Sequence, residues 1–429
     1  MRILRTFTER SGKQSRKKWG RSEMDPETPD IGLIKEAQQY LKGKINRTEL
    51  KKSTTLGRMF GCELYLKMEN HQKTGSFKSR GAIFRMSRLT DEERKAGVIT
   101  ASSGNHAQGV AYAAMINEID AKIVMPEYSV PAKVNAVQDY GAKVVLSGSN
   151  YSDSRDKAEE IRKAEGRTFI EAFNCPYIIS GQGTVGLEIL EDLPDPDIIV
   201  VPVGGGGLIS GIAIAAKTLR PSVRIIGVES EKSDSMKESI EAGKIIPHTN
   251  GESIADGISV KYPGELTLKI CSEYLDEIVT VSDESIAVAI YKLLERNKSL
   301  VEPSGAAGIA ALMEGKIDVK GKKVVVVLSG GNINFLLLSK IIYKSMELES
   351  KLVRIEFKIP DRPGTLSKIS TVISETGGNV FHAEVDNLSE DTPVGFQTIT
   401  FSINLRNSEH LNNLLKKIDG LGYRYKILK

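Results

Sequence analysis

Hydrophobic residues along most of the chain come in short unbroken runs, separated by stretches with helical spacing. Between about residue 31 and residue 342 these runs, rich in Val and Ile, are AKIVMP, AKVVLSG, PDIIVVPVG, RIIGVES and KKVVVVLSGG. Strands without apolar–polar alternation are typical of parallel sheets covered by helices on both faces. The pattern therefore predicts an α/β fold class with open twisted parallel sheets. The length of this region favours two lobes with a cleft between them.

The pattern changes near Lys351. The segments LVRIEFKIP, TLSKISTVISETG, NVFHAEVDNL, FQTITFSINL, SEHLNNLLKKIDGLG and YRYKIL follow in order and predict β, α, β, β, α and β. Their strands alternate, as antiparallel strands with one covered face should, so a ferredoxin-like α+β domain is expected. The preceding stretch YKSMELESK is charged and lacks Pro and Gly, which favours a helix running into a short joint.

These changes divide the chain into a basic tail over residues 1–24, a two-lobed unit over 25–346 and a C-terminal domain over 351–429. Within the two-lobed unit, we expect a small lobe over about residues 73–172 and a large lobe formed by the rest. The first 22 residues carry eight Lys or Arg and a single Glu. Such a tail is most often disordered. It also resembles a transit peptide in composition, and Met24 is an alternative start.

Composition narrows the setting further. Hydrophobic residues make up 40% of the 429 residues and charged residues 27%, an ordinary globular balance. No run approaches the ~20 apolar residues of a membrane span. The three cysteines have no CxxC spacing, which indicates a reducing compartment and argues against disulfides and zinc. A cytoplasmic protein without membrane or nucleic-acid partners is expected.

Four glycine-bearing turns follow strand-like runs and carry the residues best suited to chemistry. Lys78 lies in TGSFKSRGA, beside the aromatic Phe77. The other three turns are Ser102, Ser103, Gly104, Asn105 and His106 in ITASSGNHAQG, Gly204, Gly205, Gly206 and Gly207 in VPVGGGGLISG, and Ser329 in VVVLSGGNIN. Backbone N–H groups at a helix N-terminus bind anions, and glycines let the backbone wrap closely around one.

Each turn taken alone has a plainer interpretation. A glycine-rich turn is often only tight packing, a lone lysine is usually a solvated surface group, and His106 alone would more often be structural. No Lys-Ser/Thr pair follows the four glycines, which excludes a Walker A loop, and the Rossmann fingerprint is poorly matched. The five histidines show no metal-ligand spacing, so a metal enzyme is not expected.

The motifs together are far more specific. They resemble the pyridoxal-phosphate enzymes of the tryptophan synthase β-subunit fold (fold type II), and within them the threonine and serine dehydratase branch. The matching stretches are KMEN..KTGSFKSRGA, SSGNHAQG, MPEYSVPAKVNAVQDYGAKVVLSG, GQGTVGLEIL, VPVGGGGLISG and LSGGN. The C-terminal DRPGTLSKI and GGNV similarly look like an ACT domain, an amino-acid-sensing module.

The resemblance implies roles around pyridoxal 5′-phosphate. Lys78 would form the Schiff base and, once freed, remove the Cα proton of the substrate; burial beside Phe77 would depress its pKa. Asn105 would hydrogen-bond the ring oxygen O3′, and Ser329 would face the pyridine nitrogen. The phosphate of the cofactor would be held by main-chain donors, those of Gly204, Gly205, Gly206, Gly207 and Leu208.

The substrate would lie against the second turn. By the same resemblance its carboxylate is held by Ser102, Ser103, Gly104, Asn105 and His106, and Asn174, Gly181 and Gln182 belong to matching pocket segments. The implied reaction is deaminating dehydration of threonine to 2-oxobutanoate and ammonia, or of serine to pyruvate. Ser103 could also act as a second base on the opposite face, which would allow some racemisation.

Two departures from the family pattern stand out. RTEL, residues 47–50, replaces the usual Thr-Pro-Leu, so the mouth of the substrate lobe is expected to differ. Some relatives bind a cation after the strand that matches IIGVES. Glu229 fits that site, but Ser235 stands where a second carboxylate is expected, and no metal site is predicted.

In the C-terminal domain, DRPGTL opens a helix whose N–H groups could take an amino-acid carboxylate. By resemblance Asp361, Gly364 and Asn379 would bind an effector, with isoleucine or valine favoured. Such sites usually form between two ACT domains, which implies a homodimer or homotetramer. A domain that only dimerises is the alternative.

Three functions are weighed. Threonine dehydratase is favoured. Serine racemase or a β-replacement synthase on the same scaffold is the second, and keto acid against D-serine formation separates them. A non-catalytic amino-acid sensor is the third, but it predicts a lost lysine, whereas Lys78 is present. A nucleic-acid binder would rest on the basic tail alone.

Overall fold

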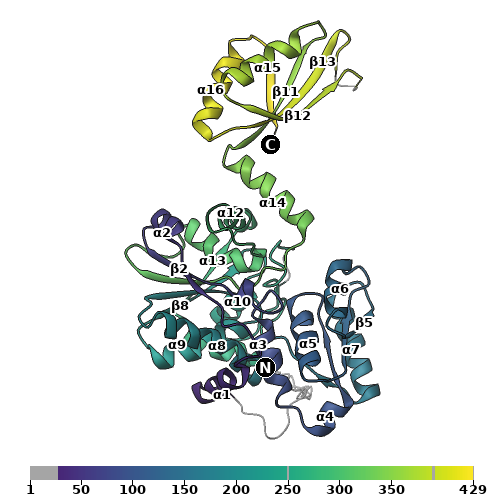
Figure 1. Ribbon diagram of the computed structural model, residues 1–429, viewed down its shortest axis with the longest axis vertical. Helices are drawn as coiled ribbons and strands as arrows, with labels where there is room; N and C mark the ends of the chain where they lie inside the picture. Colours follow the sequence, from purple (N-terminus) through teal and green to yellow (C-terminus); the bar gives the residue numbers. More distant parts are fainter. Residues whose placement is uncertain (1–27, 249–250, 389–391, 429) are drawn as a thin grey trace, which may run out of the picture.

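The computed structural model describes residues 28–248, 251–388 and 392–428. The predicted tail, residues 1–24, lies outside the described residues. Two sheets whose strands are mainly parallel form the lower body in Figure 1, where they lie side by side. A separate antiparallel sheet lies above them, beyond helix α14. This arrangement confirms the predicted α/β class with an additional α+β domain.

The larger sheet has six strands in the order β1-β2-β10-β7-β8-β9, parallel except for the pair β1 and β2. The strands are β1 Leu50–Lys52, β2 Glu63–Lys67, β7 Ile198–Pro202, β8 Arg224–Ser230, β9 Glu277–Val281 and β10 Lys323–Val327. The helices of this lobe are α1 Ile31–Leu41, α2 Thr54–Phe60, α8 Pro176–Asp192, α9 Gly207–Leu219, α10 Ser235–Ala242, α11 Glu265–Tyr274, α12 Asp283–Lys292 and α13 Pro303–Met313.

Unbroken apolar strands are needed here because both faces of this sheet are buried. Along β7, Ile198 and Val200 belong to the core on one face, whereas Ile199 and Val201 belong to the core on the other. Residues of α12 and α13 fill the first core, and residues of α8 and α9 fill the second. A polar residue on either face would lie in a dry interior.

The smaller sheet is wholly parallel, in the order β5-β4-β3-β6. Its strands are β3 Val98–Ala101, β4 Ala121–Met125, β5 Lys143–Leu146 and β6 Thr168–Phe169, and its helices are α3 Lys78–Met86, α4 Asp91–Ala96, α5 Asn105–Ile116, α6 Pro131–Gln138 and α7 Tyr151–Glu165. Helix α3 packs on α5 of this lobe and on α8 of the large lobe, so it bridges the two.

The C-terminal domain pairs its strands in the order β12-β13-β11-β14, all antiparallel. They are β11 Leu352–Pro360, β12 Asn379–Asp386, β13 Phe396–Asn404 and β14 Arg424–Leu428, with helices α15 Thr365–Glu375 and α16 Ser408–Asp419 on one face. Along β11 the buried Ile355, Phe357 and Ile359 alternate with less buried residues, as predicted.

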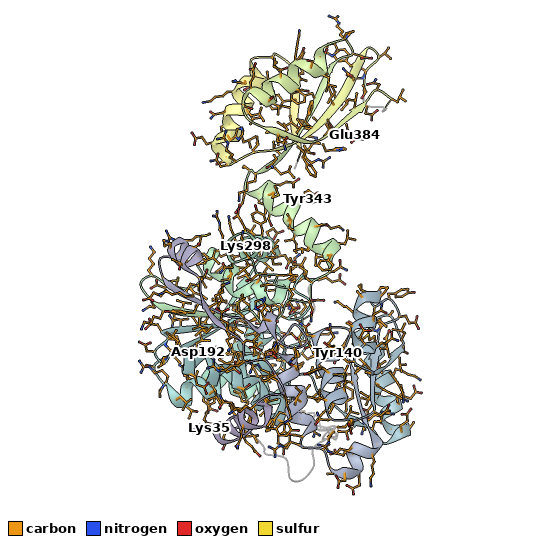
Figure 2. All side chains as sticks on the ribbon, viewed as in Figure 1. Lys35, Tyr140, Asp192, Lys298, Tyr343 and Glu384 are labelled. Carbon is orange, nitrogen blue, oxygen red and sulfur yellow. The ribbon has the colours of Figure 1, made fainter. Side chains whose placement is uncertain are left out.

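Helix α14 (Phe335–Leu348) joins the two parts, which agrees with the helix expected from YKSMELESK. Figure 2 shows Tyr343 on this helix, between the two-lobed body and the sheet that carries Glu384. The Tyr343 ring lies 5.9 Å from the ring of Phe381 on β12. At the far end of α14, Lys351 pairs with Glu349 and with Glu295, each at 2.7 Å.

Glu295 itself lies in an unusual element. Helix α12 runs directly into a single π-helical turn, Leu293–Asn297, which ends at Lys298 with a left-handed φ of 57°. Such turns are rare and are frequently found at functional sites. The chain then continues through an extended segment to Glu302, at the start of α13.

None of the helices within the described ranges is long and apolar enough to cross a membrane.

Candidate active site

A cavity of about 1640 Å³ lies between the two lobes. The turn after β3 opens into it from the small lobe, and the turns after β7 and β10 open into it from the large lobe. All three turns follow the carboxyl ends of parallel strands, where open α/β sheets bind their ligands. The predicted residues that line the cavity are Phe77, Lys78, Ser102, Ser103, Gly104, Asn105, His106, Asn174, Gly204, Gly205, Gly206, Gly207, Leu208 and Ser329.

Lys78 is the first residue of α3 and directs its amine into this cavity. Its Nζ donates to the carbonyl of Ala172 at 3.1 Å and lies 5.1 Å from the centre of the Phe77 ring. The side chain is partly exposed, but the surface that it exposes faces the cavity. Burial lowers the pKa of this amine from 10.5 to about 8, although the charge of Glu302 opposes the shift. About a tenth of the amine is therefore neutral and nucleophilic at pH 7, far more than for a lysine with the ordinary pKa of 10.5.

The turn after β10 packs directly against the turn that carries Lys78. Ser76 forms an isolated antiparallel bridge with Gly330, and the N–H of Phe77 donates to the carbonyl of Ser329 at 3.2 Å. These contacts fix Ser329 close to Phe77 on the cavity wall.

The four-glycine turn after β7 is shaped for close approach by a ligand. Gly206 has a left-handed φ of 86°, and a Cβ on Gly205 would lie 2.3 Å from the ring of Phe173. The amides of Gly205 and Gly206 have no protein acceptor among the described residues, and Gly207 begins α9, where an N–H has no intrahelical acceptor. These free donors line the cavity and suit an anion such as a phosphate.

The turn after β3 presents hydroxyl and amide groups at the start of α5. Its histidine is not a charged group, because burial, together with the nearby charge of Lys78, lowers the pKa of His106 to about 3. The His106 Nε2 lies 3.0 Å from the carbonyl of Ile170, a contact that a neutral ring makes only by donating from Nε2. His106 therefore holds the turn in place and brings no positive charge to a substrate.

Some predicted residues lie elsewhere. Gly181 and Gln182 do not line the cavity; a Cβ on Gly181 would lie 2.6 Å from Gly81, and a Cβ on Gly81 would meet the Gln182 side chain, so these residues form the tight contact between α8 and α3. The predicted effector residues Asp361, Gly364 and Asn379 lie in the C-terminal domain, at the turn before α15 and at the start of β12.

The sequence interpretation missed Glu302, Asn332 and Arg155, which also line the cavity. Glu302 is 5% exposed and accepts from Asn105 Nδ2 at 2.8 and 3.0 Å. Burial raises the pKa of Glu302 to about 7, although the hydrogen bond from Asn105 opposes the rise. The available signal was an acidic residue in VEPSGAAGIAAL, just before an almost wholly apolar helix, but that position is also typical of an ordinary helix cap.

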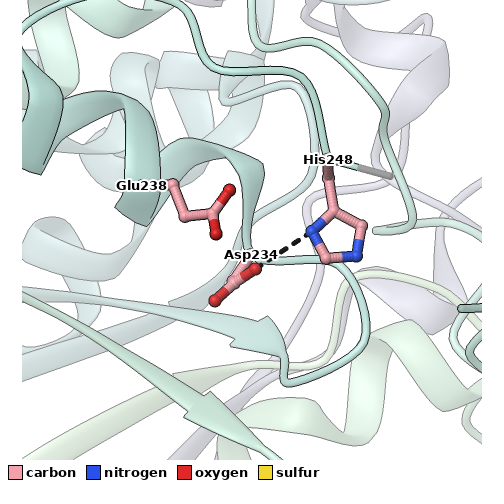
Figure 3. Close-up of side chains that lie close together, drawn as sticks. All are labelled: Asp234, Glu238 and His248. Carbon is pink, nitrogen blue, oxygen red and sulfur yellow. Dashed lines mark ion pairs between the residues drawn. The ribbon is translucent and has the colours of Figure 1, made fainter. Parts of the chain in front are cut away.

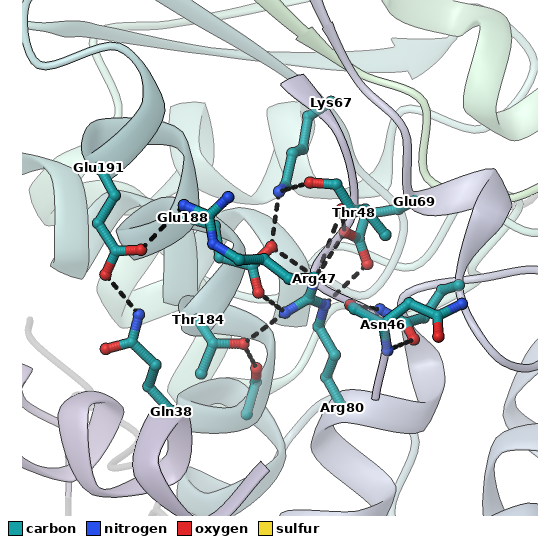
Figure 4. A network of polar contacts seen from close by, with 12 residues as sticks. Gln38, Asn46, Arg47, Thr48, Lys67, Glu69, Arg80, Thr184, Glu188 and Glu191 are labelled. Carbon is teal, nitrogen blue, oxygen red and sulfur yellow. Dashed lines mark hydrogen bonds and ion pairs between the residues drawn. The ribbon is translucent and has the colours of Figure 1, made fainter. Parts of the chain in front are cut away.

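A fully buried ionic network holds the underside of α3 (Figure 4). Arg80 donates to both oxygens of Glu69 at 2.7 and 2.8 Å and to both oxygens of Glu188 at 2.6 and 2.9 Å. Lys67 donates to Glu188 at 2.6 Å and to the carbonyl of Thr48 at 2.7 Å. The two positive and two negative side chains balance, so no net charge is buried.

Part of the RTEL segment borders this network. The hydroxyl of Thr48 donates to Glu69 inside the network, whereas Arg47 turns outward to Asp192 and Glu191 at 2.7 and 3.2 Å. Residues 47–50 do not line the cavity, and the expected difference at its mouth stays a prediction.

In the region after β8, Glu229 and Ser235 are engaged in hydrogen bonds with the backbone. The Glu229 carboxylate accepts the N–H groups of Met236 and Lys237 at 3.0 and 2.9 Å, and Ser235 donates to the carbonyl of Val260 at 2.7 Å. Nearby, Asp234, Glu238 and His248 bring their ligand atoms within 4.8 Å of one another (Figure 3). His248 Nδ1 pairs with Asp234 at 3.1 Å, and an acidic group of this kind is common without a metal.

Two protein families match two separate parts of the chain. Residues 41–330 match the family described as pyridoxal-phosphate dependent enzyme, and residues 349–423 match the ACT domain. The chain belongs to the pyridoxal-phosphate dependent enzymes. This membership confirms the family predicted from the motifs, the fold type and the ACT domain at the C-terminus.

Three similar proteins illustrate the range of this enzyme family. The L-threonine ammonia-lyase of Thermotoga maritima is 44% identical over 395 residues, which cover 92% of this chain and 98% of that protein. A threonine deaminase from Solanum lycopersicum superposes with a TM-score of 0.69 at 36% identity, covering 75% of this chain and 96% of that one. Maize serine racemase gives 0.70 at 38%, covering 75% and 99%.

The cavity fits the family's cofactor. An amine of lowered pKa lies on one wall, and backbone N–H groups without a protein acceptor among the described residues lie at a helix N-terminus on another. Lys78 would hold the aldehyde carbon, and the turn of Gly204 to Gly207 would hold the phosphate.

Proposed function

We propose that this chain is a threonine ammonia-lyase that converts L-threonine to 2-oxobutanoate and ammonia, and L-serine to pyruvate and ammonia. The observation that carries the proposal is the Lys78 amine, with its pKa lowered to about 8, opposite the four-glycine turn in one cavity. The reaction balances without an oxidant, because the water lost on elimination is regained when the product hydrolyses.

The cofactor supplies an electron sink that acidifies the Cα–H bond of a bound amino acid. Lys78 would take the Cα proton. Its amine is free and neutral, and lies near that proton, once the substrate amine has displaced it from the cofactor. Ser102, Ser103 and the amides at the start of α5 bind the substrate carboxylate. Ser329, on the cavity wall, would lie near the ring nitrogen of the cofactor, and its hydroxyl is too weak an acid to keep that nitrogen protonated.

A different reaction on the same scaffold is the second candidate. The similarity to maize serine racemase and the position of Ser103 on the cavity wall favour some racemisation of serine. A non-catalytic sensor is not favoured, because Lys78 is present and its pKa is lowered.

The C-terminal domain is proposed to regulate the enzyme by binding an amino acid near Asp361, Gly364 and Asn379. Strand β12 is an edge strand with exposed Phe381 and Val385, so a second copy of the domain would complete this site in a homodimer or homotetramer. A cytoplasmic location is proposed, since all three cysteines are free thiols.

The test measures keto acid and D-serine from purified protein supplied with pyridoxal 5′-phosphate and threonine or serine, with and without isoleucine or valine. Threonine should give 2-oxobutanoate, and Lys78→Ala should abolish both turnover and the yellow colour of the bound cofactor. Turnover retained by Lys78→Ala would contradict the proposal. D-serine as the main product would favour the second candidate.

A further inference from the structure

The side-chain amide of Asn105 is held at both ends by residues of the opposite lobe. Asn105 begins α5 in the small lobe, and its Nδ2 donates to both carboxylate oxygens of Glu302, at 2.8 and 3.0 Å. Its Oδ1 accepts from Asn332 Nδ2 at 2.7 Å, and the same Asn332 nitrogen donates to the carbonyl of Thr74 at 2.8 Å. Glu302 and Asn332 both belong to the large lobe.

These partners allow only one orientation of the amide. Rotating the Asn105 amide by half a turn would place its oxygen against the Glu302 carboxylate and its NH₂ group against the NH₂ of Asn332. Both contacts would then be repulsive, and hydrogen bonds to a charged acceptor would be lost. An amide NH₂ carries two N–H groups, of which Glu302 occupies one. The second is therefore presented to the cavity as a donor.

The close packing around Glu302 indicates that this contact is built in. The carboxylate is 5% exposed, and a Cβ on Gly330 would lie 2.4 Å from its Oε1 and 3.2 Å from Asn105 Nδ2. A carboxylate buried in this way lowers the stability of the fold. A residue kept only for stability would therefore not be expected to be a glutamate. The charge of Glu302 also raises the pKa of the Lys78 amine, against the effect of burial.

We propose that Glu302 is a positioning residue that acts through Asn105. It fixes the Asn105 amide as a hydrogen-bond donor toward the ring oxygen of the cofactor, and Asn332 secures the other end. A donor there stabilises the anionic form of that oxygen. The inference rests on the proposed role of Asn105 as a cofactor ligand.

A double-mutant cycle tests it, with pyridoxal 5′-phosphate titrated into each apo-protein while visible absorbance reports binding. At pH 8, where a carboxyl group of pKa about 7 is mostly ionised, Glu302→Met should weaken cofactor affinity about tenfold or more, because a hydrogen bond to a charged group is lost. In an Asn105→Ala background the same change should cost less than about twofold, since Glu302 then has nothing to orient. An equal loss in both backgrounds, or no loss in either, would overturn the proposal.

Glu314→Gln is the matched control, because Glu314 lies at the other end of α13 and accepts from Ser282, outside the cavity. It should leave the affinity within about twofold. If Glu302→Met does not fold, the cycle uses Glu302→Gln, which keeps the size of the side chain but removes its charge and one of the two acceptor oxygens. A loss of about fivefold that disappears with Asn105→Ala is then expected, and a loss in both backgrounds, or in neither, overturns the proposal. Wild-type protein that binds no cofactor at all would instead refute the proposed function.

Discussion

The balanced charges beneath α3 make Arg80→Met the most informative single change for stability. Arg80 is completely buried and is the shared partner of Glu69 and Glu188. Without it, Glu188 keeps Lys67 at 2.6 Å, but Glu69 keeps only the Thr48 hydroxyl. The four-charge network would then hold one uncompensated negative charge in a dry interior.

The magnitude follows from this stranded carboxylate. Removing one partner of a buried pair typically costs about 3–5 kcal/mol of unfolding free energy. Adding Glu69→Gln to Arg80→Met should restore a large part of the lost stability, since the remaining Lys67 and Glu188 pair is neutral.

Urea unfolding followed by far-UV circular dichroism gives the comparison. The control is Arg47→Met, which removes an arginine from the edge of the same network, where its side chain is 54% exposed and pairs with Asp192. A surface pair contributes about 0–1 kcal/mol, so this variant should differ little from wild type. Equal losses for the two arginine variants, or an Arg80→Met loss that Glu69→Gln does not reduce, would refute the reasoning.

Three further predictions concern the cavity and the C-terminal domain. Gly330→Ala should weaken cofactor binding in a titration of apo-protein, because a Cβ there would lie 2.4 Å from Glu302 Oε1 and push the carboxylate away from Asn105; unchanged affinity would contradict this. In apo-protein, the rate at which an amine-acylating reagent labels Lys78, followed by peptide mass spectrometry, should rise with pH with a midpoint near the Lys78 pKa of about 8, because only the neutral amine reacts. Labelling only above pH 10, as for an ordinary lysine of pKa 10.5, would contradict this. Deleting residues 351–429 should leave threonine turnover but abolish any response to isoleucine or valine in the keto-acid assay, and a retained response would place the effector site elsewhere.

Much of the fold was predictable because its strands carry an unambiguous signal. IIVVP is apolar at every position, and the structure buries both faces of β7, whereas LVRIEFKIP alternates and β11 has one covered face. The four glycine turns were predictable for a related reason, since polar residues and glycines directly after such strands meet at one edge of a parallel sheet.

The buried charges were not predictable in the same way. Lys67, Glu69 and Arg80 are each of a type that is ordinarily found at the surface. Only the packing of α3 between β2 and α8 brings opposite charges together and makes their burial tolerable. Glu302 was missed because a carboxylate before a helix is usually a cap, and its partner Asn105 lies 197 positions away in the sequence.

The π-helical turn Leu293–Asn297 has a mechanical consequence. Glu295 in that turn is anchored to Lys351 where the ACT domain begins, and the same strand of backbone reaches Glu302 a few residues later. A rotation at the base of the ACT domain would therefore be transmitted through Glu295 and the backbone that follows it to Glu302, beside Asn105. Communication between the two parts of the molecule would then need only this salt bridge and the short stretch of backbone that follows it.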